Sequence, residues 1–302
     1  MPELPEVESV RRGLDSHLVG RTFGEVTVLH PRASRDTPNL AERLAGRRIE
    51  GTGRRGKFLW LVLDDAEALV IHLRMSGQVR ITETTVPISP HTRIVAQLDG
   101  TVAQFVDQRT FGSWSLSDID EQGIPVSLSH IAPDLLDAGL DHRGVAKRLK
   151  MRRGELKPAL LDQGLVSGIG SIYADEMLWR ACLHPRQQPR RVSIARLTEL
   201  LHRGEEVMRE ALAQGGTSFD SLYVHVNGES GYFDRSLHAY GQGGEPCDRC
   251  GELMVKTKVG GTRNYFLSAV SAALLTWSAT YTMMASMIAV PMSSVVMSPA
   301  QP

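Results

Sequence analysis

Cysteine is scarce in this sequence, which contains Cys182, Cys247 and Cys250 among 302 residues. Three thiols cannot form the disulfide framework that is typical of small secreted domains, and this favours a reducing compartment. The N-terminus also lacks a basic segment followed by an apolar core, so no signal peptide is indicated. Both absences predict a cytoplasmic protein.

Net charge is lacking as well, because 34 Lys and Arg residues balance 34 Asp and Glu residues. A zero net charge argues only weakly against a nucleic-acid partner. The charge is unevenly distributed, since residues 143–157 carry a run of Lys and Arg against the single Glu155. Basic runs are usually solvated faces, and they are also what phosphate contact requires. A second basic cluster comprises Arg186, Arg190, Arg191 and Arg196.

Asp, Glu, Lys and Arg are absent altogether from residues 264–302. Within this tail, residues 266–290 are long and apolar enough to pass for a membrane span. They also contain many Ser and Thr residues and lack the flanking charges that set orientation in a membrane. We therefore predict that the protein has no membrane partner and that the tail is an aggregation liability.

The first part of the chain has the pattern of one helix followed by short strands. Residues 4–18 place Val7, Val10 and Leu14 on one helical stripe. Apolar runs of strand length, separated by Gly and Asp, predict a β-sandwich. Two of these runs are residues 58–63 and 68–73, and residues 22–28, which mix apolar and polar residues, are a further predicted strand.

From about residue 133 to residue 227 the pattern becomes helical. One predicted helix follows Gly168-Ile169-Gly170, and a glycine turn that opens a helix can present backbone N–H groups to a phosphate. Alone this signal is weak, because many helix connections contain such glycines. Helices are predicted at residues 145–149, 158–163, 173–182 and 196–214.

The first residues carry a possible nucleophile. Met1 precedes a small residue, so its removal leaves Pro2 as a terminal secondary amine. An α-amino group has a pKa near ~8, and its attack on an aldehyde-level carbon gives an iminium ion directly. Glu3 is adjacent and can transfer protons. The alternative is a proline-rich terminus without a chemical role.

A Cys-x-x-Cys pair, Cys247 and Cys250, followed by Gly251 is half of a zinc ribbon. The second pair, expected roughly fifteen to twenty residues later, is absent, and no histidine follows His238. Two thiolates do not close a tetrahedral zinc site unless two chains share the ion. A redox pair is the alternative, but no thioredoxin-like βαβ pattern precedes it.

Motifs spread over residues 1 to about 261 carry a resemblance to a known family. Besides the start Met1-Pro2-Glu3-Leu4-Pro5-Glu6-Val7-Glu8, they are Arg54-Arg55-Gly56-Lys57, residues 72–77, Asp107-Gln108-Arg109-Thr110-Phe111-Gly112, residues 168–174 and Gly215-Gly216-Thr217. In these motifs the chain resembles the formamidopyrimidine-DNA glycosylases. The resemblance implies excision of oxidised purines, such as 8-oxoguanine and formamidopyrimidines, from double-stranded DNA in the bacterial cytoplasm or nucleoid. It also implies cleavage of abasic sites and a monomeric enzyme.

Within this resemblance, three residues have implied catalytic roles. Pro2 attacks the sugar C1′ and forms a Schiff base, Glu3 protonates the sugar ring oxygen, and Lys57 contacts the phosphate or the base. β- and δ-elimination then remove both phosphates. Glu6 is a second carboxylate, which either takes part directly or bonds the start of the first helix. Residues 215–232 resemble the loop that closes over the oxidised purine.

The resemblance also implies a set of DNA-binding residues. Met75, Arg109 and Phe111 match the side chains that fill the hole left by a flipped base, where an apolar wedge replaces stacking and a guanidinium bonds the orphaned cytosine. Core packing is the alternative for Met75. The residues matched to backbone contacts are His91, in an uncertain register, Arg152, and Ser171, which stands where the family usually has Asn.

The C-terminus departs from the family. Leu267 and Val270 stand where the family has its third and fourth zinc-binding cysteines, and codons for residues 266–271 can encode Phe-Cys-Pro-Arg-Cys-Gln when read one base later. We hypothesise a one-base frameshift near codon 262, which also removes the finger's arginine. A zinc ribbon without its metal has too little core to fold. Zinc is therefore expected from the family but not bound competently by Cys247 and Cys250 of this chain.

The sequence thus predicts an α+β protein in four parts. The alternatives to the glycosylase are an endonuclease VIII-like enzyme for oxidised pyrimidines, a non-catalytic DNA-binding remnant and an unstable product. The parts are an N-terminal catalytic β-sandwich with its helix (1–130), a helix-two-turns-helix DNA-binding domain (131–236), a truncated, incomplete zinc ribbon (237–263) and an out-of-frame apolar tail (264–302).

Overall fold

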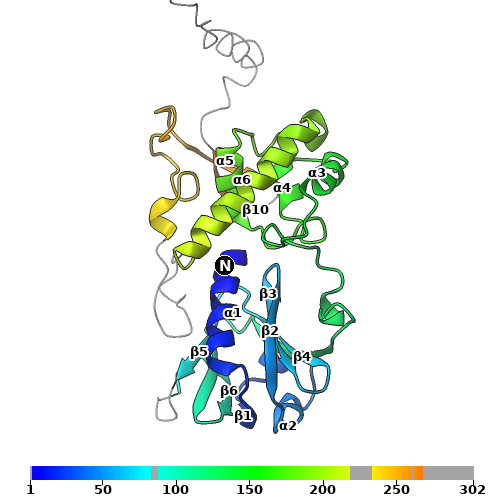
Figure 1. The fold of residues 1–302 in the computed structure, drawn as a ribbon. Coiled ribbons are helices and arrows are strands. Elements are labelled where there is room, and N and C mark those ends of the chain that lie inside the picture. The colour runs from blue at the N-terminus through cyan, green and yellow to red at the C-terminus, as the bar shows by residue number, and fades with distance from the viewer. Residues whose placement is uncertain (1, 83–87, 218–232, 260–261, 268–302) are drawn as a thin grey trace, which may run out of the picture.

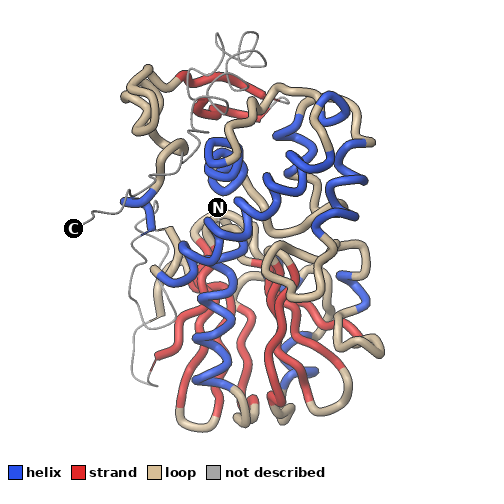
Figure 2. Tube along the Cα trace, turned by 45° about the horizontal axis from the view of Figure 1, so that its top comes forward, coloured by secondary structure: helices blue, strands red, loops and turns tan. Residues whose placement is uncertain are grey.

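The computed structural model describes residues 2–82, 88–217, 233–259 and, for the backbone, 262–267. The two four-stranded sheets and the first helix occupy one half of the molecule and most of the other helices the second half, with the N-terminus between the two halves (Figures 1 and 2). The predicted α+β class is confirmed. Most of the predicted tail lies outside the described residues.

Two antiparallel sheets form the β-sandwich, in the strand orders β1-β6-β7-β5 and β2-β3-β4-β8. Their inner faces share one core, to which Phe23, Phe105 and Trp114 contribute the largest side chains. The predicted strands at residues 58–63 and 68–73 are β3 and, one residue earlier, β4. The strands are β1 (Phe23–Val28), β2 (Ile49–Arg55), β3 (Phe58–Leu63), β4 (Glu67–His72), β5 (Gly77–Thr82), β6 (Thr92–Leu98), β7 (Thr101–Asp107) and β8 (Ser113–Asp118).

The first helix, α1 (Leu4–Leu18), joins the two halves of the molecule. Val7, Val10 and Leu14, the predicted stripe, belong to the sandwich core. Leu4, one turn earlier, belongs instead to the core of the helical half. Because one helix enters both cores, the chain segment around Pro2 and Glu3 is fixed at the junction of the two halves (Figure 1).

The helical half is built around its longest helix, α6 (Ile194–Ala213), which packs against α3 and α5. Leu197, Leu200, Leu201 and Met208 are completely buried, as their helical spacing predicts. The other helices are the short α2 (Leu40–Leu44) in the sandwich half, α3 (His142–Lys150), α4 (Leu156–Leu160) and α5 (Ser171–Arg180). Short 3-10 turns lie at Pro31–Ser34, Val126–Leu128, Pro189–Arg191 and Phe233–Ser236.

A buried ion-pair network ties the halves together through Arg54 on β2. Arg54 lies 2.7 Å from Asp134 of the helical half and 3.0 Å from Glu8 of α1. The side chains of Arg54 and Asp134 are only 10% and 5% exposed. Removing one partner of such a pair leaves the other buried and unpaired, which costs far more than loss of a surface pair.

Arg54→Ala is therefore expected to lower the free energy of unfolding by about 3–5 kcal/mol. Urea unfolding followed by tryptophan fluorescence measures this change. Arg48→Ala removes the same charge from an exposed position on the preceding turn of chain and should change stability by less than about 0.5 kcal/mol. Equal effects of the two variants would contradict the role given to the network.

Near its C-terminal end the described chain forms a two-stranded antiparallel ribbon of β9 (Val255–Val259) and β10 (Thr262–Leu267). This is the region of the predicted incomplete zinc ribbon. The four domain boundaries taken from the sequence stay predictions. No helix among the described residues combines the length and the apolar composition needed to cross a membrane.

Candidate active site

Glu3 caps the N-terminus of α5 from the other end of the sequence. Its carboxylate accepts hydrogen bonds from the backbone N–H groups of Gly170 (2.7 Å), Ile172 (2.9 Å) and Tyr173 (3.3 Å). The orphan N–H groups and the dipole of a helix N-terminus both favour an acceptor there. The side chain predicted to transfer protons is thus fixed in place and 2% exposed.

The Gly168-Ile169-Gly170 turn permits this approach. A Cβ on Gly170 would lie 2.3 Å from the Glu3 carboxyl carbon, a distance that no real Cβ reaches. Gly168 has φ +86°, and a Cβ there would lie 2.6 Å from Leu4. The two glycines are needed because the start of α1 packs directly against their backbone. The turn, predicted from its glycines as a possible phosphate site, thus binds a carboxylate of the chain itself.

Lys57 lies beside Glu3 in the tight connection between β2 and β3. Its ammonium donates a hydrogen bond to the Ile169 carbonyl at 2.9 Å, and the residue is 8% exposed. Burial lowers the pKa of Lys57, while the negative charges of Glu3 and Glu6 oppose the shift. Gly56, at φ +58°, makes the turn and lies against Ser167. The connection therefore brings Lys57 to the turn that holds Glu3.

Glu6 holds the start of α1 and the chain after α6. Its Oε2 accepts from the Glu3 backbone N–H at 2.9 Å. Its Oε1 accepts from the Tyr173 hydroxyl (2.7 Å) and from the Thr217 N–H (2.9 Å) and hydroxyl (3.0 Å). Of the two roles open for Glu6, these bonds support the one at the helix start. The loop predicted to close over the purine begins at this contact, and its residues 218–232 lie outside the described residues.

The electrostatics of the site shift the pKa of Glu3 upward. Burial raises the pKa of Glu3, and the nearby charge of Glu6 adds to the rise. Lys57 and the backbone N–H donors lower it in part. A carboxyl group with a raised pKa can act as a general acid near neutral pH. Pro2 is buried at the same junction, immediately before this group.

Met75, Arg109 and Phe111 project from two neighbouring loops of the sandwich. Met75 is 45% exposed and Phe111 39% exposed, so neither is a core side chain. Arg109 Nη1 lies 3.8 Å from Met75 Sδ. The structure thus brings at least Met75 and Arg109 into contact, as the DNA-binding prediction for this set requires, and excludes core packing as the role of Met75.

Asp107, which opens the motif at residues 107–112 but had no predicted role, is completely buried and holds these loops. One of its oxygens accepts from the Ser76 hydroxyl at 2.5 Å and from the Arg109 N–H at 3.1 Å, and the other from the Gly112 N–H at 2.7 Å. The available signal in the sequence was an Asp between the segments that carry Met75 and Phe111. A buried Asp needs several hydrogen-bond donors, which such segments can supply.

The remaining predicted DNA contacts are spread over both halves. His91 is exposed at the start of β6, and its carbonyl accepts from the Asp107 N–H at 2.9 Å. Arg152 is 46% exposed just beyond α3 and pairs with Asp162 at 2.6 Å. Ser171 is the first residue of α5, next to the turn that Glu3 caps. His91 therefore lies near the loops that carry Met75 and Arg109, and Ser171 lies near Glu3. Arg152 lies in the basic run of residues 143–157.

The two cysteines of the predicted half site do not fit a resident zinc ion. Cys247 is 4% exposed and its Sγ accepts from the Trp179 indole N–H at 3.4 Å, whereas Cys250 is exposed. No group of three possible metal ligands within the described residues includes either cysteine. Closed zinc sites need four protein ligands. Trp179, stacked on His238 at 4.5 Å and under Arg249 at 4.1 Å, instead anchors this segment on α5.

The protein combines a β-sandwich with a helical domain, and Pro2 and the buried acid Glu3 lie where the two meet. This combination defines the class of protein. Sequence models of two families match the chain, the Formamidopyrimidine-DNA glycosylase N-terminal domain at residues 1–114 and the Formamidopyrimidine-DNA glycosylase H2TH domain at residues 131–222.

Curated relatives and solved structures agree with these matches. The chain is 56% identical over 269 residues to a formamidopyrimidine-DNA glycosylase of Corynebacterium glutamicum, which covers 85% of this chain and 94% of that protein. A relative from Mycolicibacterium paratuberculosis is 55% identical over 267 residues, with the same coverage. The chain belongs to the formamidopyrimidine-DNA glycosylase family, and the predicted resemblance is confirmed.

The similar structures include complexes with DNA. The Lactococcus lactis Fpg bound to DNA with an abasic site matches with a TM-score of 0.79 and 31% identity, over 89% of this chain and 98% of that chain. A MutM complex with DNA containing carbocyclic 8-oxo-G matches with a TM-score of 0.79 and 31% identity, over 88% and 98%. The fold of the described residues is therefore that of this family.

Proposed function

We propose that the protein is a DNA glycosylase that excises oxidised purines from duplex DNA and cleaves the resulting abasic site. The observation that carries the proposal is the buried Glu3, held by the N-terminus of α5 beside Lys57 and directly after Pro2. A nucleophile, an acid and a cation converge at the junction of the two halves. The family membership and the DNA complexes of similar proteins support duplex DNA as the substrate.

The chemistry then follows from the residue types. The Pro2 nitrogen, free once Met1 is removed, forms a bond to C1′ of the damaged nucleotide while the bond from C1′ to the base breaks; the base leaves with its electron pair and takes up the proton that the proline nitrogen loses. Glu3 donates its proton to the ring oxygen, the C1′–O bond breaks, and an iminium ion remains. The iminium makes the C2′ proton acidic, so loss of that proton expels the 3′ phosphate. Lys57 offsets negative charge near the reacting sugar.

Base recognition is assigned to the exposed set of the sandwich loops. A damaged nucleotide that leaves the stack leaves a hole, which Met75 and Phe111 fill as apolar wedges. The Arg109 guanidinium donates to the base left unpaired on the opposite strand. Asp107 positions all three by fixing both loops. His91, Arg152 and Ser171 contact the DNA backbone.

The proposal also covers the oligomeric state, the location and the metal content of the protein. The enzyme acts as a monomer in the cytoplasm at the nucleoid. Zinc is not competently held by Cys247 and Cys250 alone, because a tetrahedral site lacks two ligands. The finger arginine that the family resemblance implies is also missing, so the second elimination is impaired relative to family members with an intact finger.

Single-turnover excision assays on matched duplexes test this function. The expected order is 8-oxoguanine or formamidopyrimidine opposite cytosine far above an oxidised pyrimidine opposite its partner, by at least about 10-fold, the discrimination that one well-made polar contact supplies. Undamaged duplex is the control. A preference for the oxidised pyrimidine would transfer the assignment to the endonuclease VIII-like alternative, and binding without excision of any lesion would indicate a non-catalytic remnant.

A further inference from the structure

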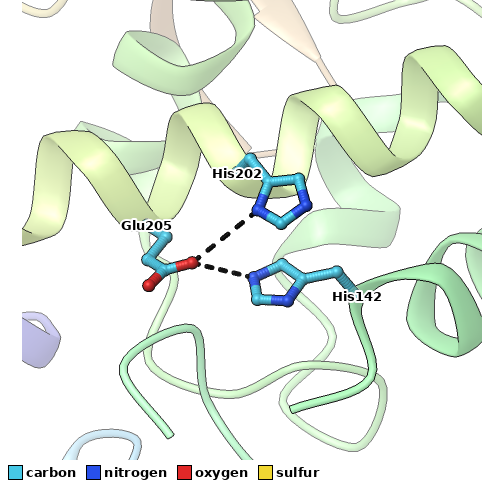
Figure 3. Close-up of side chains that lie close together, drawn as sticks. All are labelled: His142, His202 and Glu205. Carbon is cyan, nitrogen blue, oxygen red and sulfur yellow. Dashed lines mark ion pairs between the residues drawn. The ribbon is translucent and has the colours of Figure 1, made fainter. Parts of the chain in front are cut away.

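A second cluster of reactive side chains lies away from Pro2 and Glu3, between α3 and α6. It consists of His142, the first residue of α3, with His202 and Glu205 on α6 (Figure 3). It is the one group of three possible metal ligands in the part of the chain that the structure describes. Glu205 precedes Ala213, the end of α6, by roughly 12 Å of helix. The proposed function uses none of the three residues.

One oxygen of Glu205 faces a nitrogen of each imidazole (Figure 3). Glu205 Oε2 lies 3.1 Å from His142 Nε2 and 3.8 Å from His202 Nδ1, and all three atoms lie within 4.8 Å of one another. Ligands bound at about 2.0–2.1 Å in a tetrahedral zinc site are separated by about 3.3 Å. The cluster is thus near the required spacing, and side-chain rotation, chiefly of His202, separates it from a three-ligand site.

The tautomer of His142 leaves a lone pair directed into the cluster. Its Nδ1 lies 3.1 Å from the Leu140 carbonyl oxygen, which can only accept, so Nδ1 carries the proton. In the neutral ring Nε2 is then an acceptor, and it is buried without a hydrogen-bond donor. It faces a carboxylate oxygen, another acceptor. Either a proton on Nε2 or a bound metal ion reconciles the two facing atoms, and an outer carbonyl that fixes the tautomer is the usual support of a metal-binding histidine.

Hydrogen bonds from Arg209 orient the Glu205 carboxylate toward the two imidazoles. Arg209 donates two hydrogen bonds, at 3.0 and 2.7 Å, to Oε1, which leaves Oε2 directed at the imidazoles. The spacing His202-x-x-Glu205 places both ligands on one face of α6.

His202 supplies the adjustable ligand. Its ring stacks on that of His142, with centroids 4.2 Å apart and planes at 18°. Two nearly parallel rings do not share one ion, so the His202 ring has to turn about its Cβ–Cγ bond. The side chain is 53% exposed and borders a cavity of about 570 Å³, which gives its ring space to turn.

We propose that His142, His202 and Glu205 bind a divalent transition-metal ion of the zinc class, with water as a fourth ligand. Two imidazole nitrogens and one carboxylate are a donor set that zinc accepts in three-ligand sites. The ion links α3 to α6 and so stabilises the helical half of the molecule. The site is separate from Cys247 and Cys250 and independent of the proposed glycosylase activity.

Zinc titration by calorimetry tests the proposal on the full-length chain carrying Cys247→Ser and Cys250→Ser, which removes thiolate binding. One zinc ion per chain is expected, and addition of zinc should raise the melting temperature. Glu205→Gln should weaken binding at least about 10-fold, the loss that even an outer partner of a ligand produces. Glu206→Gln, the same change one residue later on α6, is the matched control and should leave the affinity unchanged.

His202→Ala is the second variant, because its half-exposed side chain can be removed without leaving a buried gap. It should abolish the zinc-dependent rise in melting temperature, while His17→Ala, at an exposed histidine of α1, should retain it. Equal zinc affinity of the Glu205→Gln and Glu206→Gln proteins would overturn the proposal. Absence of zinc binding to the starting protein would do so too, and would show that the cluster holds only a proton between His142 and Glu205.

Discussion

Glu3→Gln should lower the rate of base excision from an 8-oxoguanine duplex by about 10²- to 10⁴-fold, the usual contribution of a positioned general acid. The glutamine retains the size of the side chain but cannot supply a proton to the sugar ring oxygen. Cleavage of a duplex that already carries an abasic site should fall less, because an abasic sugar opens to its aldehyde form without protonation by Glu3. Quenched single-turnover reactions on both duplexes measure the two rates.

The rate of excision as a function of pH also tests Glu3 as the general acid. Since burial raises the pKa of Glu3, the acid form persists to higher pH than in a free glutamate. Excision should therefore slow as the pH rises through that raised pKa, and this alkaline decline should be absent from the residual activity of Glu3→Gln. Glu25→Gln, at an exposed position on β1, is the charge-matched control. A folded Glu3→Gln protein with excision within about threefold of the parent would show that another group donates the proton.

Restoring the reading frame after codon 262 should restore zinc binding and folding of the C-terminal ribbon. The frame-restored chain is expected to place cysteines at positions 267 and 270 beside Cys247 and Cys250 and so to bind one zinc ion per chain. Apparent binding energies of structural zinc in finger peptides are about 10–16 kcal/mol, which is enough to fold the ribbon outright. The intense thiolate absorption of bound cobalt reports four-cysteine coordination.

The given chain is the control for that experiment, and it should show no four-cysteine cobalt spectrum. Strand cleavage past the first elimination should be faster in the frame-restored protein. A nucleotide sequence in which no frame restores both cysteines would contradict the frameshift hypothesis. Equal metal content and equal cleavage in the two chains would contradict the account of the missing finger.

Local patterns in the sequence predicted much of the fold. The stripe Val7, Val10 and Leu14 predicted α1, because burial of one helical face depends on residues close together in the chain. The apolar run at residues 58–63 likewise predicted β3. The Gly168 and Gly170 turn was visible, but its partner was not, since Glu3 approaches it from the far end of the sequence.

The parts of the site that the sequence analysis missed depend on contacts between distant segments. Asp107 is one acid among many until the fold places the Ser76 hydroxyl beside it. The bonds of Glu6 to Tyr173 and Thr217 likewise exist only once α1 lies between α5 and the end of α6. His142 and Glu205 are far apart in the chain and carry no motif that the sequence analysis used. Family resemblance supplied Pro2, Glu3 and Lys57, and the structure adds what holds Glu3 and Lys57 in place.

The most direct test of the central claim is borohydride trapping on duplex DNA with one 8-oxoguanine opposite cytosine. The protein is prepared with Met1 retained, which makes the Pro2 nitrogen an amide, and the same preparation is then treated with methionine aminopeptidase. The account predicts a covalent protein–DNA band only after treatment, on this duplex and on an abasic duplex. A band of equal yield before and after treatment, or none on either duplex with folded, treated protein, would contradict catalysis by Pro2.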